Sequence, residues 1–253
     1  MRLWNLLSLV SMSALAATPR AADVAGNKKV REIMETYKGR GMIADDTPPT
    51  SSDAAVARME VREGLAVDLL VAEPHIAQPL YLAFDSRGRM WVTEYRQYQF
   101  PAGLKVTAYD QHLRARFDKV PEPPPRGVRG ADRVSIHTVE YGTGRVRESA
   151  VAIDGLNIAT AAIPGAGGIW VMNAPYLLFY PDADGDGRPD GDPVVEASGF
   201  GIEDTHSVAN SLQWGPDGWL YGANGSTTTG RVSTSATKEV RWEGQMIWRF
   251  HPK

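Results

Sequence analysis

The sequence predicts an all-β protein with the repeating hairpins of a β-propeller. Three segments share one layout, which is an apolar strand, a turn that contains glycine and a second strand with an aromatic residue: residues 81–92, 160–171 and 211–221. The aromatic residue is Trp91 in the first segment, Trp170 in the second and Tyr221 in the third. Hairpins that recur in this way, with further strands between them, are typical of four-stranded propeller blades.

The segment before the hairpins, residues 17–63, is predicted to be helical or extended. A first helix is expected where apolar residues recur at i, i+3, i+4 and i+7, which are Val30, Ile33, Met34 and Tyr37. Gly39 would end this helix. A second helical piece is expected over residues 52–59, with Ser52 as its N-cap.

Residues 1–16 have the pattern of a secretory signal peptide. A short apolar run over residues 3–15 follows Arg2 and ends in a small-x-small cleavage pattern. The run is too short to span a bilayer. We therefore expect a secreted or periplasmic protein, or one associated with the cell envelope, without an integral membrane span after cleavage. An uncleaved anchor is the alternative.

Strands are expected from residue 65 onward, and we place an incomplete propeller domain at 64–253. It contains a long insertion at 95–130, with a stiff proline-rich run at 121–125. A closed propeller needs at least four blades of roughly 40 to 50 residues. About three blades are expected in these residues, and six in the complete propeller.

Composition narrows the functional classes. A hydrophobic content of 43% in 253 residues is ample for a globular core. The formal net charge of -3, with scattered Lys and Arg, gives no electrostatic reason to expect nucleic acid as a partner. The chain has no cysteine, which excludes disulfides and a c-type haem attachment motif within these residues.

Residues 182–190, with the sequence DADGDGRPD, predict a calcium site. Carboxylates at the first, third, fifth and ninth positions, with glycine at the sixth, let one turn direct several oxygen ligands at one cation. The predicted ligands are four side chains and one backbone carbonyl: Asp182, Asp184, Asp186, Asp190 and the carbonyl of Arg188. Position twelve is Pro193, so the loop is not an EF-hand. A solvated acidic turn is the alternative.

The strand order of a blade sorts the loops into two rims. The loops after the first and third strands share one rim, which would hold the turns at 85–88 and 215–218 and the calcium loop. The calcium would then be structural, at the outer edge of a blade. The opposite rim would collect Glu94, the insertion and residues 203–206 and 224–231, and function is expected there.

His206 is the candidate catalytic residue on that second rim. It stands beside Glu203 and Asp204, directly before an inner strand, and a neighbouring carboxylate can fix the tautomer of a histidine that acts as a general base. The alternative is a histidine that only hydrogen-bonds the rim. Candidates for holding an anionic cofactor are Arg96, Asn224 and Arg231.

The chain resembles the membrane-bound dehydrogenase family in a combination of three stretches. These are residues 182–190, the run 203–206 followed by Asn210-Ser211-Leu212, and residues 214–222. The likeness extends from about residue 59 to residue 253. The family consists of secreted propellers and is similar to soluble sugar dehydrogenases that use pyrroloquinoline quinone (PQQ).

The resemblance implies oxidation of a sugar or alcohol hydroxyl, with PQQ as the cofactor and a c-type cytochrome as electron acceptor. In the sugar dehydrogenases a histidine before the turn takes the hydroxyl proton while hydride passes to the quinone. The matching residue is His206, one residue further from the turn, and Ser207 stands at the aligned position.

Two other functions stay open from the sequence. One is a non-catalytic propeller that binds glycans or proteins through the same rim. The other is a gluconolactonase-like hydrolase, in which a metal on the axis activates water and acidic ligands converge from several inner strands.

Overall fold

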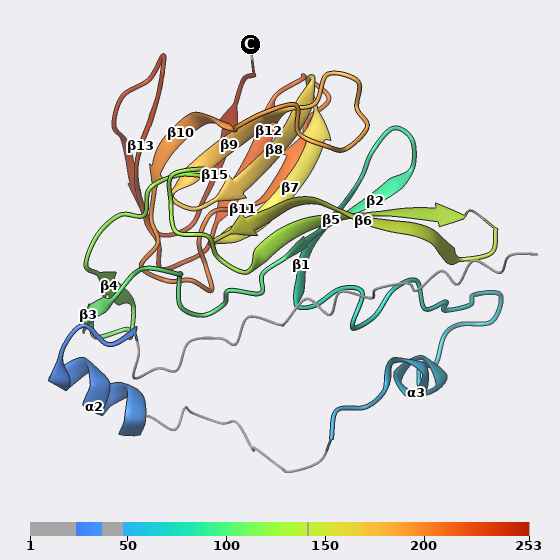
Figure 1. Ribbon diagram of the computed structural model, residues 1–253, viewed down its shortest axis with the longest axis horizontal. Helices are drawn as coiled ribbons and strands as arrows, with labels where there is room; N and C mark the ends of the chain where they lie inside the picture. Colours follow the sequence, from blue (N-terminus) through green and yellow to red (C-terminus); the bar gives the residue numbers. More distant parts are fainter. Residues whose placement is uncertain (1–23, 37–47, 141, 253) are drawn as a thin grey trace, which may run out of the picture.

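The computed structural model describes residues 24–36, 48–140 and 142–252. Antiparallel sheets are the main regular structure in this part of the chain, and two short helices precede them (Figure 1). The prediction of an all-β protein with a helical N-terminal segment is therefore confirmed. The predicted signal peptide at 1–16 lies outside the described residues. Within them, neither helix has the length and apolar character needed to cross a membrane.

The two helices form where the sequence predicts them. In α2 (Lys28–Thr36) the buried residue is Val30, and the helix packs beside the insertion hairpin. α3 (Ser52–Ala57) begins one residue earlier than predicted. Its N-cap is Ser51, whose hydroxyl oxygen accepts a backbone N–H of the first turn at 3.3 Å, and Ser52 is the first helical residue.

The first sheet is a four-stranded meander in the order β1-β2-β5-β6. Its strands are β1 (Pro79–Phe84), β2 (Arg89–Glu94), β5 (Asp132–Glu140) and β6 (Arg145–Leu156). The predicted insertion lies between β2 and β5. It forms a small hairpin of its own, made of β3 (Val106–Tyr109) and β4 (Ala115–Phe117).

The second sheet has six strands in the order β14-β13-β10-β9-β8-β7. Four belong to one meander: β7 (Ala159–Gly165), β8 (Gly168–Asn173), β9 (Tyr176–Pro181) and β10 (Val194–Phe200). The other two arrive from further along the chain as a hairpin: β13 (Thr229–Thr234) and β14 (Val240–Glu243). Because β13 pairs with β10, this hairpin extends the second sheet.

The third sheet has the order β11-β12-β15. Its strands are β11 (Asn210–Trp214), β12 (Leu220–Asn224) and β15 (Met246–Phe250). The first strands of the three sheets lie together, since β7 packs against both β1 and β11. The hydroxyl of Tyr81 on β1 donates to the carbonyl of Leu212 on β11, which ties the first sheet to the third.

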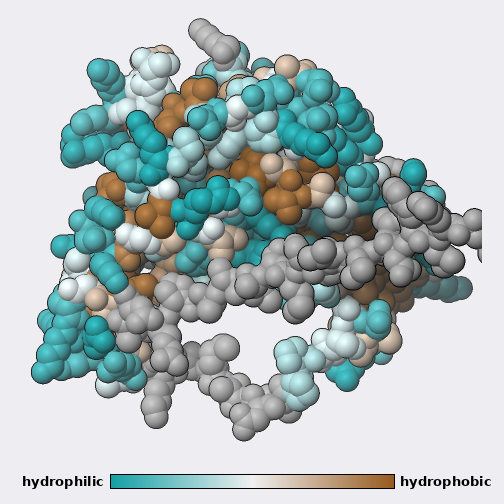
Figure 2. Space-filling view, viewed as in Figure 1, coloured by the Kyte–Doolittle hydropathy of each residue, from teal (hydrophilic) through white to brown (hydrophobic). Residues whose placement is uncertain are grey.

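The core lies between the first and second sheets and continues to the third. Trp91, Val134 and Ile136 of the first sheet belong to one cluster with most of β7, β8 and β9. Apolar side chains also show at the surface between hydrophilic segments (Figure 2). The outer face of β1, by contrast, leaves three large apolar side chains about half exposed: Leu80, Leu82 and Phe84.

One predicted strand does not form. Residues 65–73, expected as a strand, have irregular structure, and β1 begins only at Pro79. A strand needs a partner for its backbone N–H and C=O groups, and no described strand pairs with this segment. Among the described residues the turns after β1 and β7 and the loop after β9 line one common cavity, so these three connections lie at one end of the sheets.

Candidate functional site

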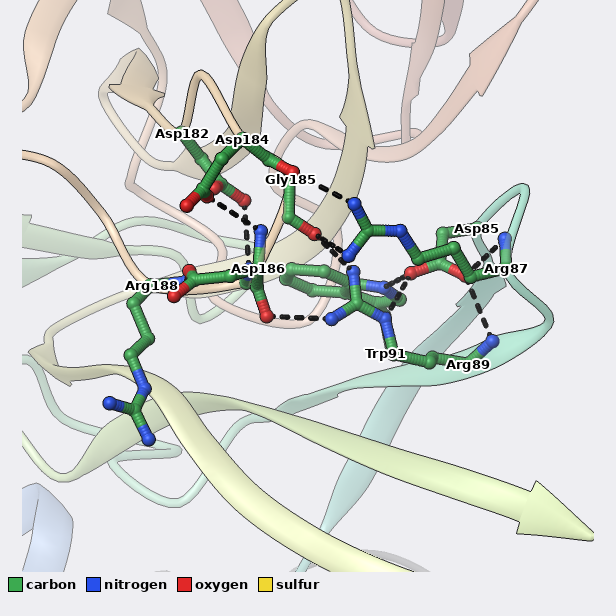
Figure 3. Close-up of polar contacts among 10 residues, drawn as sticks. Asp85, Arg87, Arg89, Trp91, Asp182, Asp184, Gly185, Asp186 and Arg188 are labelled. Atoms are coloured by element: carbon green, nitrogen blue, oxygen red, sulfur yellow. Dashed lines mark hydrogen bonds and ion pairs between the residues drawn. The ribbon is translucent and has the colours of Figure 1, made fainter.

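The acidic loop between β9 and β10 brings three carboxylates together (Figure 3). One oxygen of each of Asp182, Asp184 and Asp186 lies within 4.8 Å of the others. Gly187 has a φ of +94°, and a Cβ there would lie 2.4 Å from Cδ1 of Ile136. Only glycine fits this position, which explains why the loop has glycine at its sixth residue.

Asp182 supplies an observation beyond the clustering of charge. The residue is 5% exposed, and its Oδ1 has no hydrogen-bond partner among the described residues. Burial raises the pKa of this carboxyl, and the charges of Asp186 and Asp184 raise it further. A buried acceptor without a donor costs free energy, and a hard cation is a suitable partner for a carboxylate oxygen.

One of the five predicted ligands, Asp190, is placed differently, and the ligand predicted at Arg188 is its backbone carbonyl and not its side chain. Asp190 is not part of the three-carboxylate group, and its Oδ2 accepts the N–H of Ala183 at 2.8 Å. The side chain of Arg188 points away from the carboxylates (Figure 3). Its backbone N–H donates to Asp186 Oδ1 at 2.7 Å, so this residue takes part in the loop through its backbone.

The turn between β1 and β2 holds the same loop from the other side. Arg87 donates to the carbonyls of Asp184 and Gly185, both at 2.8 Å. Arg89 donates to the carbonyls of Asp186 at 2.6 Å and Gly185 at 2.8 Å. These carbonyls face the arginines while the carboxylates gather on the other side of the backbone (Figure 3). The expected place at the outer edge of one blade is therefore wrong, because the loop bridges the first and second sheets.

Asp85 orients the side chain of Arg89 and accepts the backbone N–H of Arg87 at 2.9 Å. Its carboxylate accepts hydrogen bonds from the side chain of Arg89 at 2.7 Å and from the indole N–H of Trp91 at 3.0 Å. Sequence reasoning identified Asp85 to Gly88 only as a turn. Two arginines on either side of Gly88 were the available signal, but which loop they reach depends on how two sheets pack.

At the opposite rim, His206 borders a cavity of about 510 Å³, which we call the His206 pocket. The cavity lies against the first strands of all three sheets, and its wall includes three tyrosines. Its polar lining residues are Gln78, Tyr81, Tyr95, Tyr98, Thr160, Thr205, His206, Asn210 and Ser211. Ser211 has a φ of +56°, a costly conformation for a residue other than glycine, and such strain is often found at functional sites.

His206 contacts the predicted carboxylate. Its Nδ1 lies 3.1 Å from Asp204 Oδ1, and its backbone N–H donates to the same oxygen at 3.0 Å. The other oxygen of Asp204 accepts the hydroxyl hydrogen of Thr227. The predicted pairing of His206 with Asp204 is thus present, and Thr227 holds the carboxylate in place.

Two further facts define the electrostatics of this group. Burial raises the pKa of Asp204, but hydrogen bonds from Thr227, from His206 and from Ser207 outweigh it, and the net pKa is lowered. Burial raises the pKa of Tyr98, and the charge of Asp204 adds to this effect. Asp204 is therefore an ionised acceptor at neutral pH, whereas Tyr98 is a neutral phenol.

The predicted cofactor ligands do not converge. Arg96, Asn224 and Arg231 are all absent from the lining of the His206 pocket. Asn224 is buried and bonded to Thr228 and to the indole of Trp248, and Arg231 lies exposed on β13 in the outer part of the second sheet. The sequence placed all three residues on one rim. In the structure β13 belongs to the second sheet and not to the third, and Arg231 therefore lies away from the pocket.

Comparison with known proteins assigns a family without a described function. The chain belongs to the family called Domain of unknown function (DUF7133), whose sequence profile matches residues 51–253. No curated protein and no solved structure gives a significant match to the chain.

Proposed function

We propose that this DUF7133 protein is part of a β-propeller whose first three blades are the three sheets. The repeated antiparallel meander supports this arrangement, since β1, β7 and β11 each begin a sheet and lie side by side. Turns after these first strands gather at one end together with the acidic loop, and the connections that carry Tyr98 and His206 gather at the other. A propeller has this separation of loops.

We further propose that the acidic loop binds calcium. The unpartnered and buried oxygen of Asp182 supports a cation more directly than the clustering of carboxylates does. Asp182, Asp184 and Asp186 would hold the ion, with the remaining ligands from backbone carbonyls or water. The role is structural, because the loop lies at the opposite rim from the His206 pocket.

At the His206 pocket we propose the oxidation of a sugar or another alcohol. The observation that carries this proposal is the histidine bonded to an ionised carboxylate at the wall of a 510 Å³ cavity lined by tyrosines and hydroxyl groups. Asp204 fixes the proton of His206 on Nδ1 and stabilises the imidazolium, which makes the histidine a proton acceptor. The tyrosine rings and polar groups suit a hydroxyl-rich ligand.

The described residues do not fit PQQ at this pocket. An anionic quinone with several carboxylates is best held by cationic donors, and the lining of the His206 pocket contains neither arginine nor lysine among the described residues, with Gln78 and Asn210 as its amide side chains. Arg96, Asn224 and Arg231 lie elsewhere. The hydride acceptor is therefore left as a quinone or dye supplied in solution, and a c-type cytochrome stays a proposed partner that follows from the resemblance alone.

The non-catalytic binding propeller is the second candidate. It is favoured by the exposure of the His206 side chain, which is 66%, since a general base is usually better shielded from water. The hydrolase alternative has less support. Among the described residues the one group of three or more metal-binding side chains is the loop at the other rim, and no acidic residue lines the His206 pocket.

The test uses purified protein with calcium, a panel of aldoses and polyols, and a reducible dye. His206→Ala should lower the rate of oxidation by a factor on the order of a hundred or more, because a positioned general base contributes about 10²–10⁴ in rate. His75→Ala is the control, as this exposed histidine lies outside the pocket. Binding of panel members without any dye reduction would favour the binding propeller. Wild-type activity in His206→Ala would remove the proposed base.

A further inference from the structure

Both ring nitrogens of His206 are occupied by protein groups. Nδ1 faces Asp204, and Nε2 is hydrogen-bonded to the hydroxyl of Tyr98. The rings of Tyr98 and His206 meet edge to face, with centroids 5.2 Å apart and planes at 78°. In this arrangement neither nitrogen is free to take a proton from a ligand directly.

The direction of the hydrogen bonds follows from Asp204. An ionised carboxylate only accepts, so the proton of the neutral imidazole is on Nδ1 and the lone pair is on Nε2. The Tyr98 hydroxyl must then donate to Nε2. A phenolic oxygen that donates one hydrogen bond can still accept another, which leaves Tyr98 able to receive a bond from a ligand hydroxyl.

Tyr98 is also fixed in the wall of the pocket. Its ring packs edge-on against Tyr95, with centroids 5.5 Å apart, and Tyr95 in turn is buried and bonded to the carbonyl of Thr205 at 3.2 Å. The segment that carries His206 is thereby joined to the start of the insertion. Two loops from different sheets therefore hold the Tyr98 hydroxyl and the imidazole in register.

We propose that Tyr98 is the catalytic residue that touches the ligand hydroxyl, with His206 and Asp204 acting behind it. This inference rests on the proposed function and changes the role of His206 from direct base to second member of a relay. The ligand O–H bond breaks and its proton moves to the Tyr98 oxygen. The Tyr98 O–H bond breaks at the same time, and its proton moves to His206 Nε2.

After both proton transfers the ligand is an alkoxide, Tyr98 is neutral again, and His206 is an imidazolium paired with Asp204. The relay needs His206, because burial raises the pKa of Tyr98 and a free tyrosinate is not available at neutral pH. The same logic operates where a histidine removes the proton of a serine hydroxyl and a carboxylate stabilises the resulting cation.

The test compares Tyr98→Phe, His206→Ala and the double variant in the dye-coupled oxidation of aldoses and polyols. Each single variant should lose about a hundredfold or more in kcat with KM changed by less than about fivefold, and the double variant should be no slower than the slower single variant. Tyr221→Phe is the matched control, since this tyrosine lines neither the His206 pocket nor the second cavity that Tyr98, Asp204 and His206 border. Wild-type kcat in Tyr98→Phe would overturn the relay.

A second measurement decides the arrangement even if the wild type oxidises no member of the panel, in which case the proposed oxidation fails. Nitrogen-15 NMR of the histidine side chains, assigned with His206→Ala, should show His206 protonated on Nδ1 and unprotonated on Nε2. Tyr98→Phe should move the Nε2 signal, and Tyr221→Phe should leave it unchanged. A proton on Nε2 in the wild type would overturn the inference, because Tyr98 could not then transfer its own.

Discussion

Asp182 carries the largest local cost in the acidic loop. Its Oδ1 is buried without a donor among the described residues, beside two other carboxylates. A bound cation would satisfy this oxygen and offset the repulsion, and its binding energy would add to the stability of the folded state.

Asp182→Asn should abolish most of the stabilisation by calcium. Calcium at a hundred times its dissociation constant should raise the free energy of unfolding of the wild type by about 2.7 kcal/mol. The variant should gain little, because it loses one charge and one ligand oxygen. Thermal unfolding with calcium and with a chelator measures both values. Asp192→Asn, an exposed change in the same connection, is the control. An equal response to chelator in all three proteins would mean that the loop binds no calcium.

Asp132 predicts a pH dependence of stability that is separate from the calcium loop. The side chain is fully buried at the start of β5, and its oxygens accept the backbone N–H groups of Gln97 at 2.5 Å and Ala159 at 2.9 Å. Burial raises its pKa to about 7, although these hydrogen bonds lower it. The unfolded value is about 3.9.

Since the folded state holds the proton more tightly than the unfolded state, the contribution of Asp132 is fully present below about pH 4 and is lost as the pH rises to about 7. The loss is at most about 4 kcal/mol, from about 1.4 kcal/mol per pKa unit. Urea unfolding at pH 5 and pH 8 with saturating calcium measures the part of this loss that falls between the two pH values. Asp132→Asn should remove this difference, and exposed Asp154→Asn should keep it. A wild type that is equally stable at both pH values would contradict the prediction.

At the scale of elements, the β1–β2 turn and the acidic loop form one unit across two sheets. Arg87 and Arg89 together donate four hydrogen bonds to three loop carbonyls. They thus neutralise the outer side of the backbone whose inner side gathers the carboxylates. The arginines preorganise the loop for a cation, because a tight turn that is held at its carbonyls loses less conformational entropy on binding.

Replacing both arginines by alanine should lower the free energy of unfolding and weaken calcium binding. The loss of stability should be about 2 kcal/mol, since hydrogen bonds to charged groups are worth about 1.5–3 kcal/mol each when shielded and less at an exposed surface. Isothermal titration with calcium and thermal unfolding test the two effects. Arg188→Ala is the control, because this side chain points away from the loop (Figure 3). Unchanged calcium affinity in the double variant would show that the turn does not support the loop.

The predicted and the observed elements show what the sequence can predict at this scale. Local patterns placed both helices, the hairpins, the insertion and the acidic loop, because periodicity, turn residues and ligand spacing act over a few residues. The hairpin β13–β14 was not predicted to join the second sheet. Along the chain this hairpin follows β12 of the third sheet, but β13 pairs with β10 of the second sheet. Strand pairing over such a distance leaves no local signal.

At the scale of the whole molecule, the two candidate sites lie at opposite ends of the sheets. The carboxylates of one were predicted residue by residue, whereas only His206 and Asp204 of the other were. Tyr81 of the first sheet and Tyr98 of the insertion line the His206 pocket, and Thr227 of the connection after β12 holds Asp204. Which tyrosine contacts His206 depends on packing between sheets. No local pattern in the sequence distinguishes Tyr98 from the other tyrosines of the insertion.

The central claim is that a hydroxyl-rich ligand binds in the His206 pocket with its reacting hydroxyl on Tyr98. A crystal structure of the calcium-loaded protein soaked with the panel member that binds most tightly tests this most directly. We expect the ligand to pack against Tyr81, Tyr95 and Tyr98, with one of its hydroxyl groups within hydrogen-bond distance of the Tyr98 oxygen. A ligand bound at another surface, with the His206 pocket holding only water, would contradict it.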